Sequence, residues 1–298
     1  MAGTDYTDDL RLAHLLADDA DSLTMTRFKA LDLHVMSKPD LTPVTDADRA
    51  VEESIRRTLA KARSRDAVTG EEQGTSGHSQ RRWIVDPIDG TKNFVRGVPV
   101  WATLIALAVD GEVVLGVVSA PALQRRWWAV KDGGAWTGKL IKPTRCEVSD
   151  VRRLQDASLS YASLGGWEDA GLGDDFLALM RRCWRTRAYG DFWSYMLLAE
   201  GAVDLAVEPE LEVYDMAALD IIVREAGGRF TSLAGEDGPW GGNALASNGH
   251  LHDAALAFVG SVAGAEDDPD WPQHGPGSVS DLRSRRRPES GDSGTPAE

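Results

Sequence analysis

Asp86 and Asp89 are the residues of this sequence best placed to do chemistry, because two carboxylates three positions apart follow directly on an apolar run at 83–85. The carbonyl of Ile88 lies between them, so three oxygen groups can converge on hard divalent cations, which prefer oxygen ligands. Gly90-Thr91 comes next and could begin a helix whose backbone N–H groups suit phosphate oxygens. The same residues also fit a tight turn that caps a helix, so this segment alone leaves both interpretations open.

Two further acidic segments occur where a strand or a helix is expected to end or begin. Glu71-Glu72 follows the short apolar run Ala67-Val68, and Asp215 stands at the start of a predicted helix. Each has an ordinary explanation, either a solvated acid or a helix N-cap. Together with Asp86 and Asp89, these acids favour a site that gathers divalent metal ions.

Four motifs in a fixed order make the sequence similar to the inositol monophosphatase superfamily. They extend from about residue 38 to residue 228, and their combination is much more specific than any one of them. One departure is Tyr214, where relatives commonly have Trp; it stands beside a ligand position rather than at one. The motifs are residues 38–48 (KPDLTPVTDAD), 70–72 (GEE), 86–91 (DPIDGT) and 214–218 (YDMAA) with 225–228 (EAGG).

The resemblance implies an α+β fold, a layered α/β/α/β/α sandwich of the inositol monophosphatase and fructose-1,6-bisphosphatase type. It also implies a magnesium-dependent phosphatase site that holds two or three Mg²⁺ ions and is inhibited by lithium. The implied catalytic residues are Asp48 and Thr91, which would orient and deprotonate the attacking water, with Glu71 and with Lys38 close to the metals. The implied metal ligands are Glu71, Asp86, Asp89, Asp215 and the Ile88 carbonyl.

Phosphomonoester hydrolysis agrees with such a site on physical grounds. The reaction gives protein groups little covalent work, so positioning and charge neutralisation around the phosphoryl group dominate catalysis. No serine or cysteine nucleophile is required. The alternative from a different class is a non-catalytic module that binds a metal or an anion, which the loss of a ligand position would have supported; all the ligand positions are present.

Two segments of the chain resemble the actinobacterial branch of the superfamily that acts on L-histidinol phosphate, residues 119–129 (SAPALQRRWWA) and 185–195 (RTRAYGDFWSY). This resemblance implies a phosphatase of histidine biosynthesis that releases L-histidinol. A cationic leaving group calls for acids or aromatic rings, unlike the neutral polyol of an inositol phosphate. An inositol-1-monophosphatase or a broad sugar-phosphate phosphatase is the alternative, because the superfamily uses similar metal sites for many esters.

The residues expected to bind the substrate serve both the phosphate and the leaving group. Asp191 and Glu208 match positions that border the leaving group in the superfamily, and either could pair with an ammonium. Arg187 could approach the phosphate or hold an acid of the site, and a salt bridge at a strand end explains it equally well. The aromatic residues within 189–193 could stack on an imidazole or pack in the core. The expected set is Gly90, Thr91, Arg187, Asp191, Glu208 and Asp215.

These residues need a scaffold that brings distant segments together. Hydrophobic spacing predicts a helix over about residues 8–33 and a second helix that starts near Thr45. Short β-rich runs follow at 83–85, 101–109 and 113–119, the last two joined by Asp110-Gly111, so we expect an antiparallel sheet. The second half alternates strands at 157–161, 185–189, 203–207 and 244–247 with helices at 174–183, 192–200, 215–226 and 251–259.

The chain is expected to form one phosphatase domain over residues 1–264. This domain would consist of an N-terminal α+β half, about 1–145, and a C-terminal α/β half, about 146–264, since 298 residues suffice for one large core. Residues 265–298 are rich in Pro, Gly, Ser and charge and lack an apolar period, so they are expected to be a disordered tail.

Composition limits the partners and the location. A net charge of −15 opposes binding to nucleic acid, and no stretch approaches the ~20 apolar residues of a membrane span, so neither nucleic acid nor membrane is expected as a partner. The N-terminus lacks the pattern of a secretory signal, which indicates a cytoplasmic protein whose Cys146 and Cys183 stay reduced. The resemblance alone implies a homodimer that acts on a small phosphate monoester.

Overall fold

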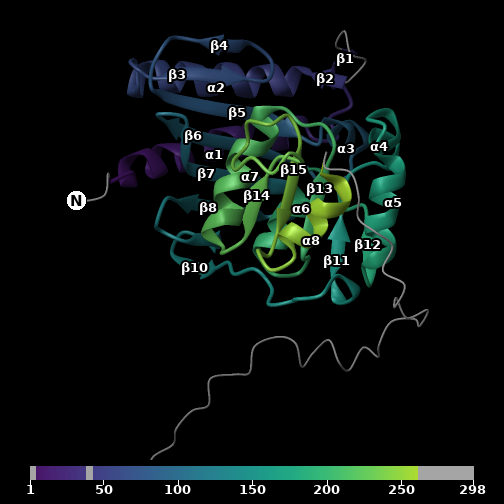
Figure 1. Ribbon diagram of the computed structural model, residues 1–298. Coiled ribbons are helices and arrows are strands. Elements are labelled where there is room, and N and C mark those ends of the chain that lie inside the picture. The colour runs from purple at the N-terminus through teal and green to yellow at the C-terminus, as the bar shows by residue number, and fades with distance from the viewer. Residues whose placement is uncertain (1–4, 38–42, 261–298) are drawn as a thin grey trace, which may run out of the picture.

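A computed structural model describes residues 5–37 and 43–260 of the chain. Its helices and β-sheets form alternating layers, which can be followed in Figure 1. Lys38 of the first motif and the tail expected over 265–298 lie outside the described residues, and so does the expected end of the domain at residue 264. The domain boundaries therefore stay a prediction.

The larger sheet has eight strands in the order β10-β9-β8-β7-β6-β5-β3-β4. Neighbouring strands in it are antiparallel except β3 and β5, which run parallel, so the expected antiparallel sheet is correct but for this pair. The strands are β3 (Ala67–Gly70), β4 (Gly74–Ser76), β5 (Arg81–Asp89), β6 (Ala102–Val109), β7 (Glu112–Ala120), β8 (Arg125–Val130), β9 (Ala135–Lys139) and β10 (Lys142–Arg145).

Strand β5 runs through the acidic motif, which corrects the expectation of a strand that ends before Asp86. Asp86 pairs with Leu104 and Asp89 with Ala102, and the register shifts between these two pairs. Pro87 lies in the shifted segment and has no N–H to donate, so the ladder is interrupted there and resumes at Asp89. The resulting bulge redirects the side chains next to it.

Helices α1 (Thr7–Arg27) and α2 (Asp46–Ala62) cover one face of this sheet. Leu16 of α1 and Ile55 of α2 share a core cluster with Trp83 of β5. Helix α1 ends before the expected position near residue 33, because the chain becomes extended after it and Lys29 adopts a left-handed backbone conformation with φ of 63°.

Thr45 fixes the start of α2, as the sequence predicted. Its side chain accepts the N–H groups of Ala47 and Asp48, and the Asp48 carboxylate accepts the N–H of Thr45, which completes a capping box. The short strands β1 (Val35–Ser37) and β2 (Pro43–Thr45) form a two-stranded sheet immediately before this helix.

The smaller sheet has the order β12-β11-β13-β15-β14 and belongs to the second half of the chain. Its expected strands are all present, and one strand that was not expected, β14, lies at its edge. The strands are β11 (Ser158–Ser160), β12 (Arg185–Arg187), β13 (Leu205–Glu208), β14 (Arg229–Thr231) and β15 (Ala244–Ser247).

Two helices fill the space between the sheets. The core cluster around α6 (Asp191–Ala199) and α7 (Val213–Glu225) contains Leu104 of the large sheet and Ala206 of the small one. Helices α4 (Leu164–Asp169), α5 (Gly173–Arg182) and α8 (His252–Val259) pack on the other face of the small sheet; α4 and α5 stand beside β11 and β12 at the right of Figure 1. The layers are therefore helix, sheet, helix, sheet, helix, which confirms the expected α+β sandwich.

Helix α7 packs directly on strand β7 at Gly116. A Cβ atom added at Gly116 would lie 2.7 Å from Ile221 Cγ2 and 2.8 Å from the carbonyl oxygen of Ala218. The absence of a side chain at residue 116 thus lets the helix seat directly on the strand. This contact sets the position of the N-terminal turn of α7, which carries Asp215.

Two further observations bear on the predictions from composition. Within residues 5–37 and 43–260, none of the helices has the length and apolar character that crossing a bilayer requires. Cys146 and Cys183 are both free thiols, as expected.

Candidate active site

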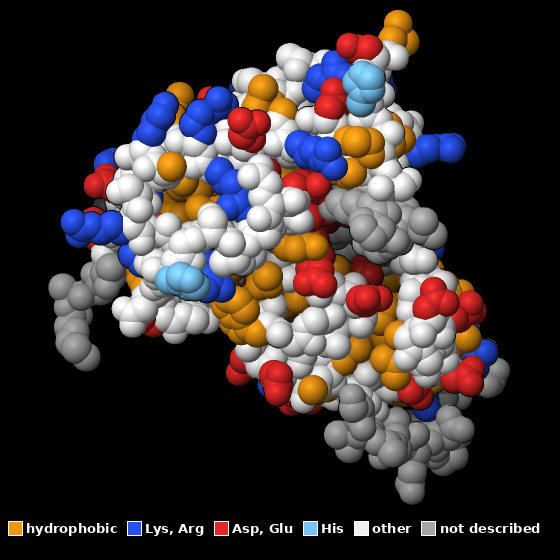
Figure 2. Space-filling view, turned by 90° about the horizontal axis from the view of Figure 1, so that it is seen from above, with side chains coloured by type: hydrophobic (Ala, Val, Ile, Leu, Met, Phe, Trp, Pro, Cys, Tyr) orange, Lys and Arg blue, Asp and Glu red, His pale blue; other side chains and the backbone are white. Residues whose placement is uncertain are grey.

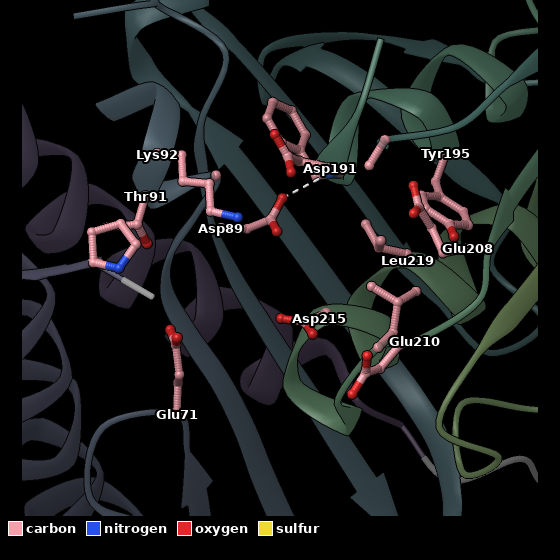
Figure 3. Close-up of a pocket in the computed structure, with 15 residues that line it drawn as sticks. Glu71, Asp89, Thr91, Lys92, Asp191, Tyr195, Glu208, Glu210, Asp215 and Leu219 are labelled. Carbon is pink, nitrogen blue, oxygen red and sulfur yellow. Dashed lines mark hydrogen bonds between the residues drawn. The ribbon is translucent and has the colours of Figure 1, made fainter. Parts of the chain in front are cut away.

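One cavity of about 340 Å³ lies between the end of β5, the first turns of α6 and α7, and the end of β13. Acidic side chains gather in a hollow of the surface in Figure 2, and Figure 3 shows how the carboxylates of this cavity surround it. Lys92 is the one cation among the described residues that line it. The acids that line it are Glu71, Asp89, Asp191, Glu208, Glu210 and Asp215.

Asp86, Asp89 and Asp215 form the first acidic cluster of the site. Each offers a carboxylate oxygen, and these oxygens all lie within 4.8 Å of one another. Two of the residues come from the bulged strand β5 and the third from the first turn of α7, where the N–H of Glu212 donates to Asp215 Oδ2 at 2.8 Å. The fold therefore joins two of the motifs that are far apart in sequence.

Crowding of these carboxylates in a buried place disfavours their charged forms. Burial, and then the charge of Glu71, raises the pKa of Asp86 well above its usual value. Burial, and then Asp191, has the same effect on the pKa of Asp89. Burial raises the pKa of Asp215 to about 7, against the hydrogen bond from Glu212. Such a cluster is stable in its ionised form only beside a compensating positive charge.

The donor set fits a hard divalent cation. Every polar group in the cluster is a carboxylate oxygen, and the motif adds the backbone carbonyl of Ile88. Oxygen-only sites of this kind suit Mg²⁺ rather than metals that prefer nitrogen or sulfur. The acidic clusters can therefore hold metal ions.

A second cluster joins Asp48, Glu71 and Glu72, whose carboxylate oxygens also lie within 4.8 Å of one another. Asp48 accepts the Thr45 N–H at 2.8 Å, while its burial raises its pKa to about 6. Thr91 Oγ1 lies 3.4 Å from Asp48 Oδ1 and donates to the Ile88 carbonyl at 2.9 Å. The structure thus brings the expected pair, Asp48 and Thr91, to the edge of the acidic clusters.

Glu52 is a buried acid that the sequence analysis missed. Its side chain is fully buried and accepts the backbone N–H groups of Glu72 at 2.7 Å and Gln73 at 3.1 Å, next to the ion pair with Arg56 at 2.7 Å. A Cβ at Gly70 would lie 2.4 Å from this carboxylate. Glu52 therefore fixes the turn after β3 that presents Glu71 to the site.

Asp191 links the first acidic cluster to the opposite side of the cavity. It begins α6 in a left-handed conformation, with φ of 49°, and its Oδ2 accepts the Asn93 amide at 3.0 Å. The next N–H, that of Phe192, donates to Asp89 Oδ2 at 2.7 Å, the bond drawn in Figure 3. Burial raises the pKa of Asp191, and the charge of Lys92 opposes this shift.

Gly90 makes room for this arrangement at the start of α3 (Thr91–Arg96). Its φ of +83° favours glycine, and a Cβ there would lie 3.2 Å from Asp191 Oδ2 and 3.0 Å from the Val100 carbonyl oxygen. The helix start expected at Gly90-Thr91 is therefore present, and the glycine has a steric reason as well as a conformational one.

Glu208 ends β13 and closes the side of the cavity opposite Glu71 and Thr91 (Figure 3). It is only 6% exposed, accepts a backbone hydrogen bond from Ala162, and has a pKa raised well above its usual value by burial and then by Asp191. Asp191 and Glu208 thus add acids on the side of the cavity that α6 and β13 form, opposite Glu71. Tyr195 and Glu210 line the same cavity and were not expected from the sequence.

Some expected residues do not line the cavity. Arg187 is exposed in β12 and donates to the Thr186 carbonyl at 2.7 Å, so its approach to the phosphate stays a prediction. Tyr189 and Trp193 pack against each other with their ring centroids 6.0 Å apart. Phe192 lines the cavity, but its side chain is fully buried in the core cluster between the sheets.

Comparisons with known proteins agree with this arrangement. The chain matches the Inositol monophosphatase family over residues 6–262. It is 63% identical over 260 residues to a histidinol-phosphatase of Streptomyces coelicolor, a match that covers 86% of this chain and 98% of that protein. It is 61% identical over 251 residues to a histidinol-phosphatase of Mycobacterium tuberculosis, covering 84% of this chain and 96% of that protein.

A solved structure shares the fold as well. The extragenic suppressor protein suhB from Bartonella henselae superposes with a TM-score of 0.78 at 30% identity, covering 86% of this chain and 99% of that one. The sandwich, the acidic clusters at the bulge of β5 and the family match over nearly all described residues lead to one conclusion. The chain belongs to the inositol monophosphatase family.

Proposed function

We propose that this protein is a Mg²⁺-dependent histidinol-phosphatase, which hydrolyses L-histidinol phosphate to L-histidinol and phosphate. The observation that carries the proposal is the pairing, in one cavity, of carboxylate clusters suited to metal with a separate acidic wall suited to a cationic leaving group. The high identity to two proteins named as histidinol-phosphatases supports the same substrate. A neutral polyol phosphate would leave the charge of Asp191 and Glu208 uncompensated.

The residues of the metal clusters would hold two or three Mg²⁺ ions. Glu71, Asp86, Asp89, Asp215 and the Ile88 carbonyl are the proposed ligands. Bound magnesium would supply the neutralising charge and the acidified water that phosphoryl transfer needs. Lithium is expected to compete for these positions and inhibit.

The protein's own groups would position the phosphate and the attacking water. Thr91 Oγ1 and Asp48 lie close enough to hold a water between them and the phosphorus, and Asp48 would take up its proton. The raised pKa of Asp48, about 6, suits such a general base near neutral pH. Backbone N–H groups at Gly90-Thr91 would bind phosphate oxygens. Lys38 and Arg187 are proposed to assist at the phosphate.

The leaving group would be held by Asp191 and Glu208 on the side of the cavity that α6 and β13 form, the leaving-group wall. Asp191 lies beside Asp89, because the N–H of the next residue, Phe192, donates to Asp89 and the charge of Asp191 raises the Asp89 pKa. Asp191 is therefore the proposed partner of the ammonium, which stands next to the ester carbon. Glu208 lies farther along the wall and would meet the other end of the leaving group (Figure 3).

The test is phosphate release by the purified protein with L-histidinol phosphate and with inositol 1-phosphate, each with and without Mg²⁺. We expect kcat/KM to favour L-histidinol phosphate by at least about tenfold, since a site built for polar groups rejects analogues that lack them. Activity should vanish with a chelator and fall with lithium. Equal rates, or a preference for inositol 1-phosphate, would overturn the proposal that L-histidinol phosphate is the substrate. The absence of Mg²⁺-dependent phosphate release from either ester would overturn the proposal that the protein is a phosphatase.

We further propose that the protein is a homodimer, as the family resemblance implies, and that it is located in the cytoplasm. Sedimentation of the purified full chain at working concentration would give twice the mass of 32.2 kDa for a dimer. A monomer under these conditions would remove that proposal and leave the catalytic one unaffected.

A further inference from the structure

Two buried polar atoms on the leaving-group wall have no hydrogen-bond partner among the residues that the structure describes. They are the hydroxyl of Tyr195 and the Oε1 oxygen of Glu208. Their side chains are 1% and 6% exposed, and both residues line the same cavity. A buried polar group without a partner costs about 1–3 kcal/mol, so a pair of them facing one cavity points to a ligand that satisfies both.

The positions of both side chains are set by packing. Tyr195 lies one turn after Asp191 on α6, and its ring contacts Phe230 with a centroid separation of 5.8 Å. Glu208 is tied to the backbone of Ala162. Figure 3 shows the two side chains next to each other, on the far side of Asp215 from Glu71 and Thr91. Packing therefore holds both side chains on the side of the cavity opposite Glu71 and Thr91.

The chemistry of the pair is that of one donor and one acceptor. Burial, and then the neighbouring Glu208, raises the pKa of Tyr195 well above 10, so the phenol keeps its proton and can donate it. The Glu208 Oε1 oxygen can only accept while the carboxylate is ionised. A neutral imidazole matches both, because one ring nitrogen carries N–H and the other carries a lone pair.

The order of groups along the cavity agrees with this match. Asp89 marks the phosphate end, Asp191 comes next, and Tyr195 with Glu208 lies beyond (Figure 3). L-Histidinol phosphate presents its groups in the same order, with phosphate first, then the ammonium on the neighbouring carbon, then the imidazole.

We propose that Tyr195 is a specificity-determining residue: its hydroxyl donates to one nitrogen of the substrate's imidazole while Glu208 accepts from the other. This inference rests on the proposed function, because it assumes that L-histidinol phosphate is the substrate. The contact acts on the part of the substrate remote from the phosphorus. It should therefore contribute mainly to KM, with a smaller effect on kcat.

The experiment compares wild type with Tyr195→Phe on two esters, L-histidinol phosphate and L-phenylalaninol phosphate. The second ester keeps the phosphate and the ammonium and replaces the imidazole by a phenyl ring. We expect Tyr195→Phe to lower kcat/KM for L-histidinol phosphate about tenfold, through KM, as the loss of one hydrogen bond predicts. It should change kcat/KM for L-phenylalaninol phosphate less than about twofold, because that ester never used the hydroxyl.

The thermal midpoint of the free protein separates this role from a structural one. Because the hydroxyl is buried without a described partner, Tyr195→Phe should leave Tm unchanged or raise it. Tyr6→Phe, at the N-cap of the distant helix α1, serves as the control for removal of a phenol and should keep both activities. A fall in Tm with equal loss on both esters would overturn the proposal, and so would unchanged kinetics on both.

Failure of the proposed function would look different. A wild-type protein that hydrolyses L-phenylalaninol phosphate as well as L-histidinol phosphate would overturn the imidazole subsite while leaving an amino-alcohol phosphatase. A wild-type protein that releases phosphate from neither ester with Mg²⁺ would overturn the proposed function and this inference together.

Discussion

The two walls of the cavity are built differently. One acidic cluster lies on the bulged strand β5 and the first turn of α7, and the other on α2 and the turn after β3; within each, the carboxylate oxygens lie within 4.8 Å of one another. The leaving-group wall comes from α6 and β13 of the other half, and it carries polar atoms without described partners. One wall is suited to attract metal ions whatever the ester, whereas the other can distinguish one leaving group from another. Catalysis and selectivity should therefore respond to separate substitutions.

Asp89→Asn is expected to have the largest effect, a loss of turnover that is equal for every substrate. It removes one charge from the cluster that would hold Mg²⁺, so turnover should fall at least about a hundredfold on all phosphate esters, with Tm preserved. Steady-state kinetics at saturating Mg²⁺ would measure the loss. Asp19→Asn, an exposed position on α1, is the control. Retained activity in Asp89→Asn would mean that the cluster containing Asp89 is not the metal site.

Asp191→Asn should affect one class of substrate far more than another. Asparagine tolerates the left-handed backbone of residue 191, so the fold should survive while the charge is lost. We expect kcat/KM for L-histidinol phosphate to fall roughly tenfold to a hundredfold, and for inositol 1-phosphate to change little. An equal loss of kcat/KM on both esters would mean that Asp191 serves catalysis in general and not the choice of leaving group.

Glu52→Gln should weaken metal binding without contacting metal. The amide keeps the size of the side chain but presents a donor where two backbone N–H groups now donate to the carboxylate. The Mg²⁺ concentration for half-maximal activity should rise about tenfold, as for other groups that orient metal ligands, while selectivity between esters stays constant. Glu53→Gln, the exposed neighbour on α2, should behave as wild type. An unchanged Mg²⁺ requirement would limit Glu52 to a structural role.

The smallest expected effect is a change of stability with pH that is caused by His252. This residue lies in the half of the chain that carries the leaving-group wall. Its ring bonds Thr231 of β14 and Ser247 of β15, each at 3.0 Å, and burial, then Arg229, lowers its pKa to about 4. The unfolded chain therefore takes up a proton first as pH falls below about 6.5, so stability should decrease by on the order of 2 kcal/mol between pH 6.5 and 4.

Urea denaturation at several pH values would measure this slope. His252→Gln should flatten it, although the variant starts from a lower stability, and the exposed His78→Gln should leave it unchanged. The same slope in wild type and His252→Gln would mean that other groups, such as the buried His14 with its pKa lowered to about 4, cause the acid sensitivity.

The gathering of Asp86, Asp89 and Asp215 could be predicted from the sequence because these acids lie in short segments with distinctive neighbours. Asp86 and Asp89 share one motif with a proline and a glycine, and Asp215 opens a helix that its hydrophobic spacing made visible. Even there, the continuation of β5 through the motif was missed. Local pattern suggested a strand end, whereas pairing with β6 resumes after the bulge.

Glu52 and Tyr195, whose roles depend on contacts between distant segments, were not predicted. Glu52 follows Asp48 by four positions on α2, a spacing that places both on one helix face and could have indicated a shared site. Its partners lie twenty residues on, in a turn that only the fold reveals. Tyr195 gave no such signal, because its unsatisfied hydroxyl becomes apparent only once α6 lies against β13.

The bond from the Phe192 N–H to Asp89 has a consequence for how such enzymes diverge. It is made by the backbone, so any residue except proline at position 192 can supply it. Mutation can therefore exchange side chains along α6 during evolution while the carboxylate that they neighbour stays anchored. A lineage could in this way acquire a new substrate through single substitutions, each intermediate retaining a working catalytic centre.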